Sequence, residues 1–241
     1  MKKKEVRKIY DNYQKATDIL AMEKVSKLYK LATTDPKTGL YNSTFFANEL
    51  NHEISIALRY GSPISLILID IDDFKKINEK YGYLRADKML IEISDIIKDN
   101  LRKTDFAARF GGEEFVLLLP ETTQKKAKEV AERLRSQVQK DKLLLKYKVT
   151  ISIGVSSIEK KLKKRKAYEK VVKIPKQVIQ RSDVFSYLRA IQIPEMPEKN
   201  GTTETSEDLF KKANLALKYA KTHGKNRVIV YNERLLKVCT I

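Results

Sequence analysis

The spacing of apolar residues predicts a long N-terminal helix over residues 2–34. This stretch contains no Gly or Pro, and its apolar side chains recur at three- and four-residue intervals. Pro36 disfavours helix at the residue before it, so the helix is expected to end there. A helix of this length ahead of a domain is expected to pack on a partner chain; the alternative is a helix folded back on its own domain.

Beyond this helix the pattern alternates between helical and strand periodicity. Helices are predicted at residues 43–60, 72–80, 84–101, 123–139 and 206–222. Strands are predicted at residues 64–71, 105–110, 114–119, 147–155 and 227–231. The continuous apolar run at 64–71 suits the centre of a sheet. This order of elements predicts an α+β fold, an α/β sandwich in which helices cover a mixed sheet.

A long segment, residues 157–205, interrupts the alternation before the last helix. It contains three prolines and exceeds the usual length of a connection in a compact domain. We interpret it as an insertion, ordered in part around residues 171–193. Seven of the twelve residues at 159–170 are Lys or Arg. Such a block predicts a solvated surface or, alternatively, an electrostatic contact with nucleic acid, membrane or a partner.

The net charge of +18 favours anionic partners, which include nucleotides, nucleic acids and acidic membrane surfaces. No apolar run reaches the length of about 18 residues that a membrane span needs, and no apolar core of a signal peptide follows the basic start. The single cysteine, Cys239, excludes an internal disulfide framework and fits a reducing compartment. We therefore expect a cytoplasmic protein.

Acidic residues stand at the end of one predicted strand and between two others. The carboxylate of Asp70 follows a run of Leu and Ile, where it is costly unless compensated. Gly111 and Gly112 are typical of a two-residue hairpin turn and are expected to take positive φ values, which would hold Glu113 and Glu114 beside the sheet. If the strands are neighbours, Asp70 and Glu113 could share Mg²⁺ bound to a triphosphate, which suits phosphoryl transfer. Taken alone, the acids could equally be a helix cap and a solvated turn.

Together these residues resemble the GGDEF family of diguanylate cyclases, whose signature hairpin is Gly-Gly-Asp/Glu-Glu-Phe. The resemblance covers about residues 32–231 apart from the insertion. Its motifs stand in the family's order at residues 35–42, 70–78, 81–87, 111–115, 152–155 and 220–227. The resemblance implies a ferredoxin-like core of the nucleotidyl-cyclase and polymerase-palm type. It also implies a bacterial enzyme that condenses two GTP molecules into cyclic di-GMP and two pyrophosphates.

The resemblance further implies a metal site. Asp70, the backbone carbonyl of Ile71 and Glu113 would hold Mg²⁺ or Mn²⁺, with two ions per half-site. Glu114 is the candidate to assist deprotonation or metal binding. With Lys75, these three carboxylates are the expected catalytic residues.

Nucleotide contacts follow from the same resemblance. Asn78 and Asp87 would bind the guanine base, because a carboxylate can accept from the N1 and amino donors of guanine. The phosphates would be contacted by Lys75, Lys221 and Lys225. The nucleotide would also lie close to the backbone of Gly111 and Gly112.

Each domain would hold one GTP, so catalysis implies a homodimer in which two half-sites face each other. On this interpretation residues 1–34 are a signalling and dimerisation helix, and residues 35–241 are the cyclase domain with its basic insertion.

Arg102 and Asp105 match the family's Arg-x-x-Asp motif, which binds the product and inhibits the enzyme. Arg133, on the following helix, is expected to contribute to the same site. The simpler explanation is a surface ion pair, which contributes little energy.

Two other functions remain open. One is a non-catalytic cyclic di-GMP receptor that uses Arg102 and Asp105; the intact Asp70, Glu113 and Glu114 count against it. The other is a nucleic-acid-binding protein, suggested by the charge. It is the weaker candidate, because the basic residues are not interleaved with aromatic residues in a stacking pattern.

Overall fold

A mixed sheet forms the centre of the structure, a computed structural model that describes residues 3–159, 205–233 and 235. The strand order is β1-β3-β4-β2-β5-β6. The strands are β1 (Tyr41–Asn42), β2 (Ile64–Ile71), β3 (Phe106–Arg109), β4 (Glu114–Pro120), β5 (Ile151–Ile158) and β6 (Val228–Val230). Strand β2 pairs antiparallel with both β4 and β5, whereas β1–β3 and β5–β6 are parallel pairs. The strand that carries Asp70 is therefore central.

Helices flank this sheet. Their bounds are α1 (Lys3–Thr33), α2 (Ser43–Tyr60), α3 (Phe74–Tyr81), α4 (Tyr83–Asp99), α5 (Gln124–Lys140), α6 (Lys142–Lys146) and α8 (Ser206–Thr222). Side chains at the N-cap positions accept hydrogen bonds from free backbone N–H groups: Asn42 caps α2, and Thr123 caps α5. Thr205 and Asp208 form a reciprocal capping box at the start of α8.

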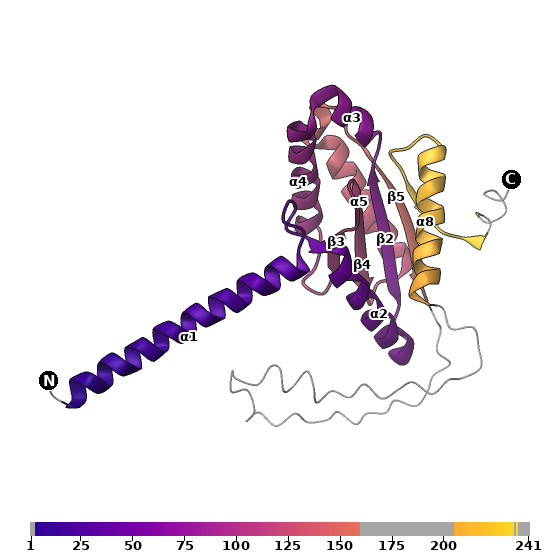
Figure 1. Ribbon diagram of the computed structural model, residues 1–241. Helices are drawn as coiled ribbons and strands as arrows, with labels where there is room; N and C mark the ends of the chain where they lie inside the picture. The colour runs from indigo at the N-terminus through magenta and orange to yellow at the C-terminus, as the bar shows by residue number, and fades with distance from the viewer. Residues whose placement is uncertain (1–2, 160–204, 234, 236–241) are drawn as a thin grey trace. The chain divides into compact units, whose positions relative to one another are not determined.

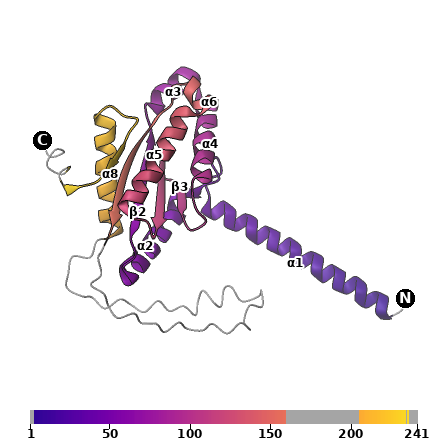
Figure 2. The ribbon, with the colours of Figure 1, turned by 180° about the vertical axis from the view of Figure 1, so that it is seen from behind.

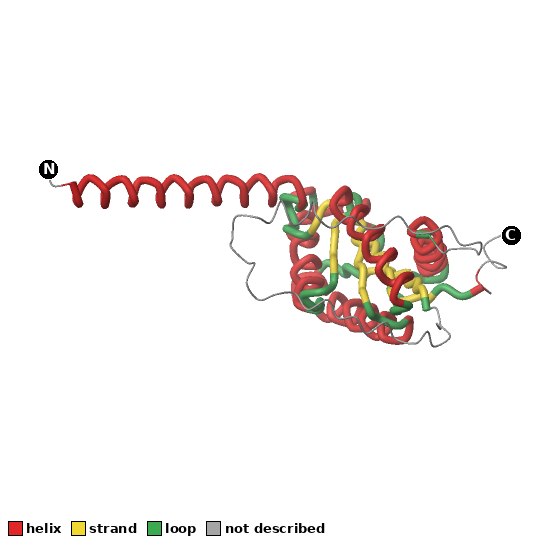
Figure 3. The backbone as a smooth tube through the Cα atoms, turned by 90° about the horizontal axis from the view of Figure 1, so that it is seen from below, coloured by secondary structure: helices red, strands yellow, loops and turns green. Residues whose placement is uncertain are grey.

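The two faces of the sheet are covered by different helices (Figures 1 and 2). Alternate residues of β2 point to opposite faces: Leu66 packs with α2 and α8, while Ile67 packs with α4 and α5. Seen from below, the strands lie between helices on both sides (Figure 3). All eight residues of β2 are buried, as its apolar run predicts. The predicted α+β fold is confirmed.

The predicted bounds of α2, β2 and α8 agree with the structure. The strand predicted at residues 147–155 is wrong at both ends, because β5 spans Ile151–Ile158. Short helix α6 occupies part of the stretch before it and was not predicted. Since Ser157 and Ile158 pair with β2, the insertion cannot begin at residue 157. Its ordered part, expected at 171–193, and its basic block beyond residue 159 lie outside the described residues.

The described part of α1 presents its apolar residues to solvent. Every residue from 18 to 32 is exposed, and the large apolar side chains there are 56–64% accessible. This exposure does not fit the alternative of a helix folded back on its own domain. Among the described residues, no helix is long and apolar enough to cross a membrane.

Candidate active site

Strand pairing brings the predicted acidic residues to one end of the sheet. Asp70 on β2 lies directly opposite Glu114 on β4, and the backbone N–H of Ile71 donates to the carbonyl of Glu113 over 3.3 Å. The condition for a shared site, that the two strands are neighbours, is therefore met. Asp70 is 3% exposed, whereas Glu114 is exposed and Glu113 half-buried.

The turn between β3 and β4 differs from the predicted two-residue hairpin. It is a four-residue loop, 110–113, closed by hydrogen bonds from the N–H groups of Phe110 and Gly111 to the carbonyl of Glu114. Neither Gly111 nor Gly112 has a positive φ, so the expectation of left-handed glycines is wrong. A Cβ at Gly112 would meet no atom within 4 Å, so the backbone there is open to close approach by a ligand.

Arg109 holds this loop in place. Its guanidinium donates to the carbonyl of Gly112 from Nε (3.2 Å) and Nη2 (2.7 Å), and its Nη1 lies 3.4 Å from the carboxylate of Asp35. Asp35 in turn accepts from the backbone and hydroxyl of Thr38. The bend that follows α1 and the acidic loop are thereby joined through one side chain. Sequence reasoning missed this role, because Asp35 and Arg109 are 74 residues apart.

Burial dominates the electrostatics of Asp70. The pKa of its carboxyl is raised to about 6. Desolvation by burial is the largest cause, a hydrogen bond and the charge of Lys221 act against it, and the charges of Glu113 and Glu114 add to it. The Nζ atom of Lys221 lies 2.6 Å from Oδ2 of Asp70. The lysine that was predicted to bind phosphate thus pairs with the carboxylate that was predicted to bind metal.

These residues fit a divalent metal. A buried carboxylate whose charge is costly, with Glu113 close by in the loop before β4, provides the few protein oxygens that Mg²⁺ takes. No group of three or more His, Cys, Asp or Glu side chains converges within the described parts of the chain. Backbone carbonyls, water and phosphate oxygens are the further ligands that Mg²⁺ commonly takes.

Asp72 is a second buried carboxylate, and it has a structural role. Its oxygens accept from the hydroxyls of Thr150 (2.7 Å) and Ser152 (2.6 Å) and from the N–H of Asn226 (3.0 Å). These bonds join the end of β2 to β5 and to the loop that carries Lys225. Sequence reasoning placed Asp72 in a polar helical stretch and missed this role.

The predicted base-binding residues lie on consecutive helices, Asn78 on α3 and Asp87 on α4. Gly82, with φ of 80°, separates the two helices, and its N–H donates to the carbonyl of Asn78. Asp87 forms an ion pair of 2.5 Å with Lys37, from the loop that follows α1. Lys37 was not among the predicted site residues, because 50 residues separate it from Asp87.

The other predicted phosphate-binding lysines lie near the same end of β2. Lys75 is exposed on α3. Lys225 pairs with Asp73 over 2.6 Å, and Lys76 pairs with Asp73 over 2.8 Å. Hydrogen bonds from Lys225 and Lys76 lower the pKa of Asp73 to about 2. Asp73 therefore keeps its charge, and the two lysines are already neutralised in part.

Of the predicted inhibitory residues, Arg102 and Asp105 lie just before β3, and Arg133 lies on α5. The backbone N–H of Arg102 donates to Oδ2 of Asp105 over 2.9 Å, while Oδ1 of Asp105 is buried without a hydrogen-bond partner. Burial raises the pKa of Asp105. Arg133 donates to the side chain (2.6 Å) and carbonyl (3.2 Å) of Asn100, two residues before Arg102. Within the described part of the chain it makes no hydrogen bond or ion pair with Asp105.

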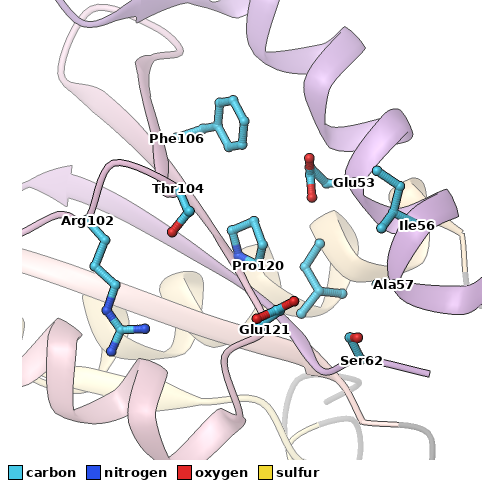
Figure 4. A pocket seen from close by; sticks show the side chains of 10 residues that line it. Glu53, Ile56, Ala57, Ser62, Arg102, Thr104, Phe106, Pro120 and Glu121 are labelled. Carbon is cyan, nitrogen blue, oxygen red and sulfur yellow. The ribbon is translucent and has the colours of Figure 1, made fainter. Parts of the chain in front are cut away.

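A pocket of about 390 Å³ opens beside Arg102 (Figure 4). Its walls come from α2, from the chain around Thr104 and Phe106, and from the end of β4. Glu53 and Glu121 add carboxylates to this largely apolar lining. Neither Asp105 nor Arg133 lines it, so the pocket and the predicted motif adjoin at Arg102 only.

The described sheet, with its helices on both faces, defines an α+β fold of the palm type. The coiled coil and GGDEF domain of DgcB from Caulobacter crescentus, solved in complex with c-di-GMP, matches it with a TM-score of 0.65 and 23% identity, covering 95% of this chain and 100% of that chain. The diguanylate cyclase SiaD from Pseudomonas aeruginosa, solved with its activator SiaC, matches with a TM-score of 0.60 and 26% identity, covering 94% of this chain and 71% of that one.

Sequence comparison identifies the family. The profile of the family described as "Diguanylate cyclase, GGDEF domain" matches residues 32–183, so the chain belongs to the GGDEF family. The response regulator PleD from Caulobacter vibrioides is 40% identical over 133 residues, 53% of this chain and 29% of PleD. Diguanylate cyclase A from Treponema denticola is 39% identical over 168 residues, 67% of this chain and 43% of that protein. The chain therefore spans less than half the length of these relatives.

Proposed function

We propose that this protein is a diguanylate cyclase, which condenses two GTP molecules into cyclic di-GMP and releases two pyrophosphates. The observation that carries the proposal is the register that sets Asp70 opposite Glu114, with Glu113 hydrogen-bonded to the next residue of β2. Membership of the GGDEF family and similarity to proteins named as diguanylate cyclases support the same reaction.

In this proposal Asp70, the carbonyl of Ile71 and Glu113 hold Mg²⁺ or Mn²⁺, two ions per half-site. When bound, the metal neutralises charge on the triphosphate. Lys75, Lys221 and Lys225 contact phosphate oxygens. Lys221 must then exchange its bond to Asp70 for one to phosphate.

Asn78 and Asp87 read the guanine base. The carboxylate of Asp87 accepts from the N1 and amino groups of guanine, a pattern that adenine cannot offer. Lys37 pairs with Asp87 over 2.5 Å, so this ammonium and the guanine donors would share one carboxylate. The open backbone at Gly112 leaves room for the ligand.

The reaction joins two half-sites. The 3′-oxygen of one GTP bonds to the α-phosphorus of the other, the bond from that phosphorus to the pyrophosphate oxygen breaks, and the hydroxyl proton passes to a base. Glu114, exposed beside the site, is the proposed base. The ring closes when the 3′-oxygen of the second nucleotide bonds to the α-phosphorus of the first and displaces the second pyrophosphate. The catalytic unit of this proposal is therefore a homodimer. The exposed apolar residues of α1 offer a surface on which two copies can pair.

A second function is favoured by Asp105, whose buried Oδ1 lacks a donor. Cyclic di-GMP carries guanine N–H donors that could satisfy it, and Arg102 offers a guanidinium for guanine edges or phosphate. In an active cyclase this site gives product inhibition. In an inactive protein the same site makes a cyclic di-GMP receptor, which is the alternative function.

The deciding experiment incubates the full chain, stripped of copurified nucleotide, with GTP and Mg²⁺ and resolves the products by chromatography. The matched variants are Glu113→Gln and Glu129→Gln, which alters an exposed carboxylate on α5. We expect cyclic di-GMP from the wild type and Glu129→Gln but not from Glu113→Gln. No product at any protein concentration, together with binding of cyclic di-GMP that depends on Arg102, would establish the receptor instead.

Removal of residues 1–32 tests the role of α1 in pairing. We expect the specific activity of the shortened chain to fall at low protein concentration and to recover at high concentration. Unchanged activity at low concentration would contradict a pairing role.

A further inference from the structure

A separate pocket of about 230 Å³ lies between α3, the turn before β5 and the loop after α8. Among the residues proposed above to contact nucleotide or metal, only Lys225 lines it. Asp70, Lys75, Asn78 and Lys221 do not. The pocket therefore adjoins the proposed phosphate site on one side and extends away from it.

The lining is strongly basic. Lys76 and Lys80 come from α3, Lys148 from the turn before β5, and Lys225 from the loop after α8. Within the described residues, neither Lys80 nor Lys148 has a carboxylate at ion-pair distance; Lys80 instead lies 5.1 Å from the ring of Tyr81. Two ammonium groups of this pocket are thus without a counter-charge.

Two acids also line the pocket, and both have other partners. Asp72 accepts three hydrogen bonds, from the hydroxyls of Thr150 and Ser152 and from the N–H of Asn226. Asp73 is shared between Lys76 and Lys225. Four lysines against two aspartates leave an excess of two positive charges in the lining.

The backbone around the pocket is held in an uncommon conformation. Five non-glycine residues of the described chain have positive φ, and three of them line this pocket: Asp73 (54°), Lys148 (56°) and Lys225 (56°). Such residues persist only where surrounding structure holds them, and they cluster at functional sites. The hydrogen bond from Asn226 N–H to Asp72 provides that support next to Lys225.

We propose that this pocket binds an inorganic oligophosphate, and we assign pyrophosphate to it. A volume of 230 Å³ is below the range of about 300–1,000 Å³ typical of pockets for larger organic ligands, which favours a small anion. Ammonium groups suit phosphate as point charges. The choice of pyrophosphate rests on the proposed function, which releases it next to Lys225; the basic lining of the pocket is observed whichever reaction the protein catalyses.

The test is calorimetric titration of the full chain with sodium pyrophosphate in buffer free of divalent metal and nucleotide. We expect binding to weaken by about tenfold or more in Lys80→Gln/Lys148→Gln, since each lost charge removes a charge-assisted contact. Lys142→Gln, which alters an exposed lysine of α6 outside the lining, should bind as the wild type does. Lys148→Gly, which accepts the positive φ, replaces the double variant if that variant fails to fold.

The proposal would be overturned by no binding to the wild type, by equal weakening in Lys142→Gln, or by a loss confined to Lys221→Gln. The last would place pyrophosphate in the nucleotide site. Orthophosphate is titrated in parallel, and equal affinity for it would overturn the oligophosphate assignment. A protein that binds pyrophosphate through Lys80 and Lys148 but makes no cyclic di-GMP would leave this site standing while the proposed function fails.

Discussion

The Nζ atom of Lys221 lies 2.6 Å from Oδ2 of Asp70, so a cation from the last turn of α8 neutralises the buried carboxylate at the end of β2. Any phosphate that recruits Lys221 removes this counter-charge, and another positive charge must then replace it. The pair therefore couples occupancy of the proposed phosphate position to the charge of Asp70.

Replacing Lys221 by Met should raise the pKa of Asp70 above its value of about 6, because loss of the cation disfavours the carboxylate. Titration of the Asp70 carboxyl carbon by NMR in metal-free buffer measures the change. Lys225→Met is the control, since Lys225 pairs with Asp73. An Asp70 pKa that does not move in Lys221→Met would contradict the pairing.

Replacing Gly154 by Ala should destabilise the fold. A Cβ there would lie 2.2 Å from the carbonyl oxygen of Ala213 and 2.4 Å from the backbone N of Leu217, so α8 would have to move off β5. Overpacking of this kind costs about 1–3 kcal/mol. Denaturant unfolding measures it, with Gly112→Ala as the control, where the added Cβ meets nothing within 4 Å. Equal stability of the two variants would show that the contact between α8 and β5 is looser than described.

Asp105 should make stability depend on pH. Burial raises its pKa in the folded state above the usual 3.8, although the N–H and charge of Arg102 oppose the shift. The folded protein then holds the proton more tightly than the unfolded chain. This contribution to stability is complete below pH 3.8 and is lost as pH rises through the folded pKa.

Asp105→Asn removes that titration and can still accept from Arg102 N–H. Its stability relative to wild type should therefore increase as pH rises above about 3.8, the ordinary pKa of the group. Unfolding curves of both proteins at several pH values measure the difference. A difference that does not change with pH would mean that Asp105 titrates normally in the folded state.

Replacing Arg109 by Lys should loosen the loop 110–113. Lysine keeps the charge but lacks the fork that donates twice to the carbonyl of Gly112 while facing Asp35. Faster hydrogen exchange is expected at the N–H groups of Phe110 and Gly111, which close the loop. Arg135→Lys, on α5, is the control. Protection that is unchanged in Arg109→Lys would show that the loop is held without this side chain.

Replacing Arg102 by Ala should relieve inhibition by cyclic di-GMP if the Arg-x-x-Asp motif binds the product. Loss of a charged hydrogen bond of about 1.5–3 kcal/mol corresponds to about a tenfold or larger rise in the inhibitory concentration. Initial rates at increasing cyclic di-GMP measure it. Lys103→Ala, at the exposed neighbouring position, serves as the control. Identical inhibition of all three proteins would remove Arg102 from the site.

Features that depend on local sequence could be predicted. The apolar run of β2 and the helical spacing of α2 and α8 identify these elements to the residue, because periodicity and caps act over a few positions. The short helix α6 and the two-residue strand β1 are too brief to carry such a pattern. The glycine pair predicted a hairpin but not the length of its loop. That length depends on the hydrogen bonds from Phe110 and Gly111 to the carbonyl of Glu114.

The residues of the candidate site also fall into two groups, those that local sequence signals identify and those that only the folded chain brings together. Asp70 and Glu113 could each be singled out, since a buried strand end and an acidic hairpin are both local signals, but the pairing of their strands stayed a condition until the fold was known. Lys37 and Arg109 could not, because each meets its partner only after the chain has folded across 50 or more residues. Single surface cations have no periodicity that would distinguish them among the 49 Lys and Arg residues.

The position of β2 in the sheet has a consequence for heat inactivation. Asp70 is on a strand hydrogen-bonded on both sides and can leave its place only when the whole fold melts, whereas Glu113 belongs to a loop that can open by itself. On warming, the two halves of the acidic site should separate at the loop while the sheet is still intact. Function would then be lost at a lower temperature than secondary structure, and cooling would restore it.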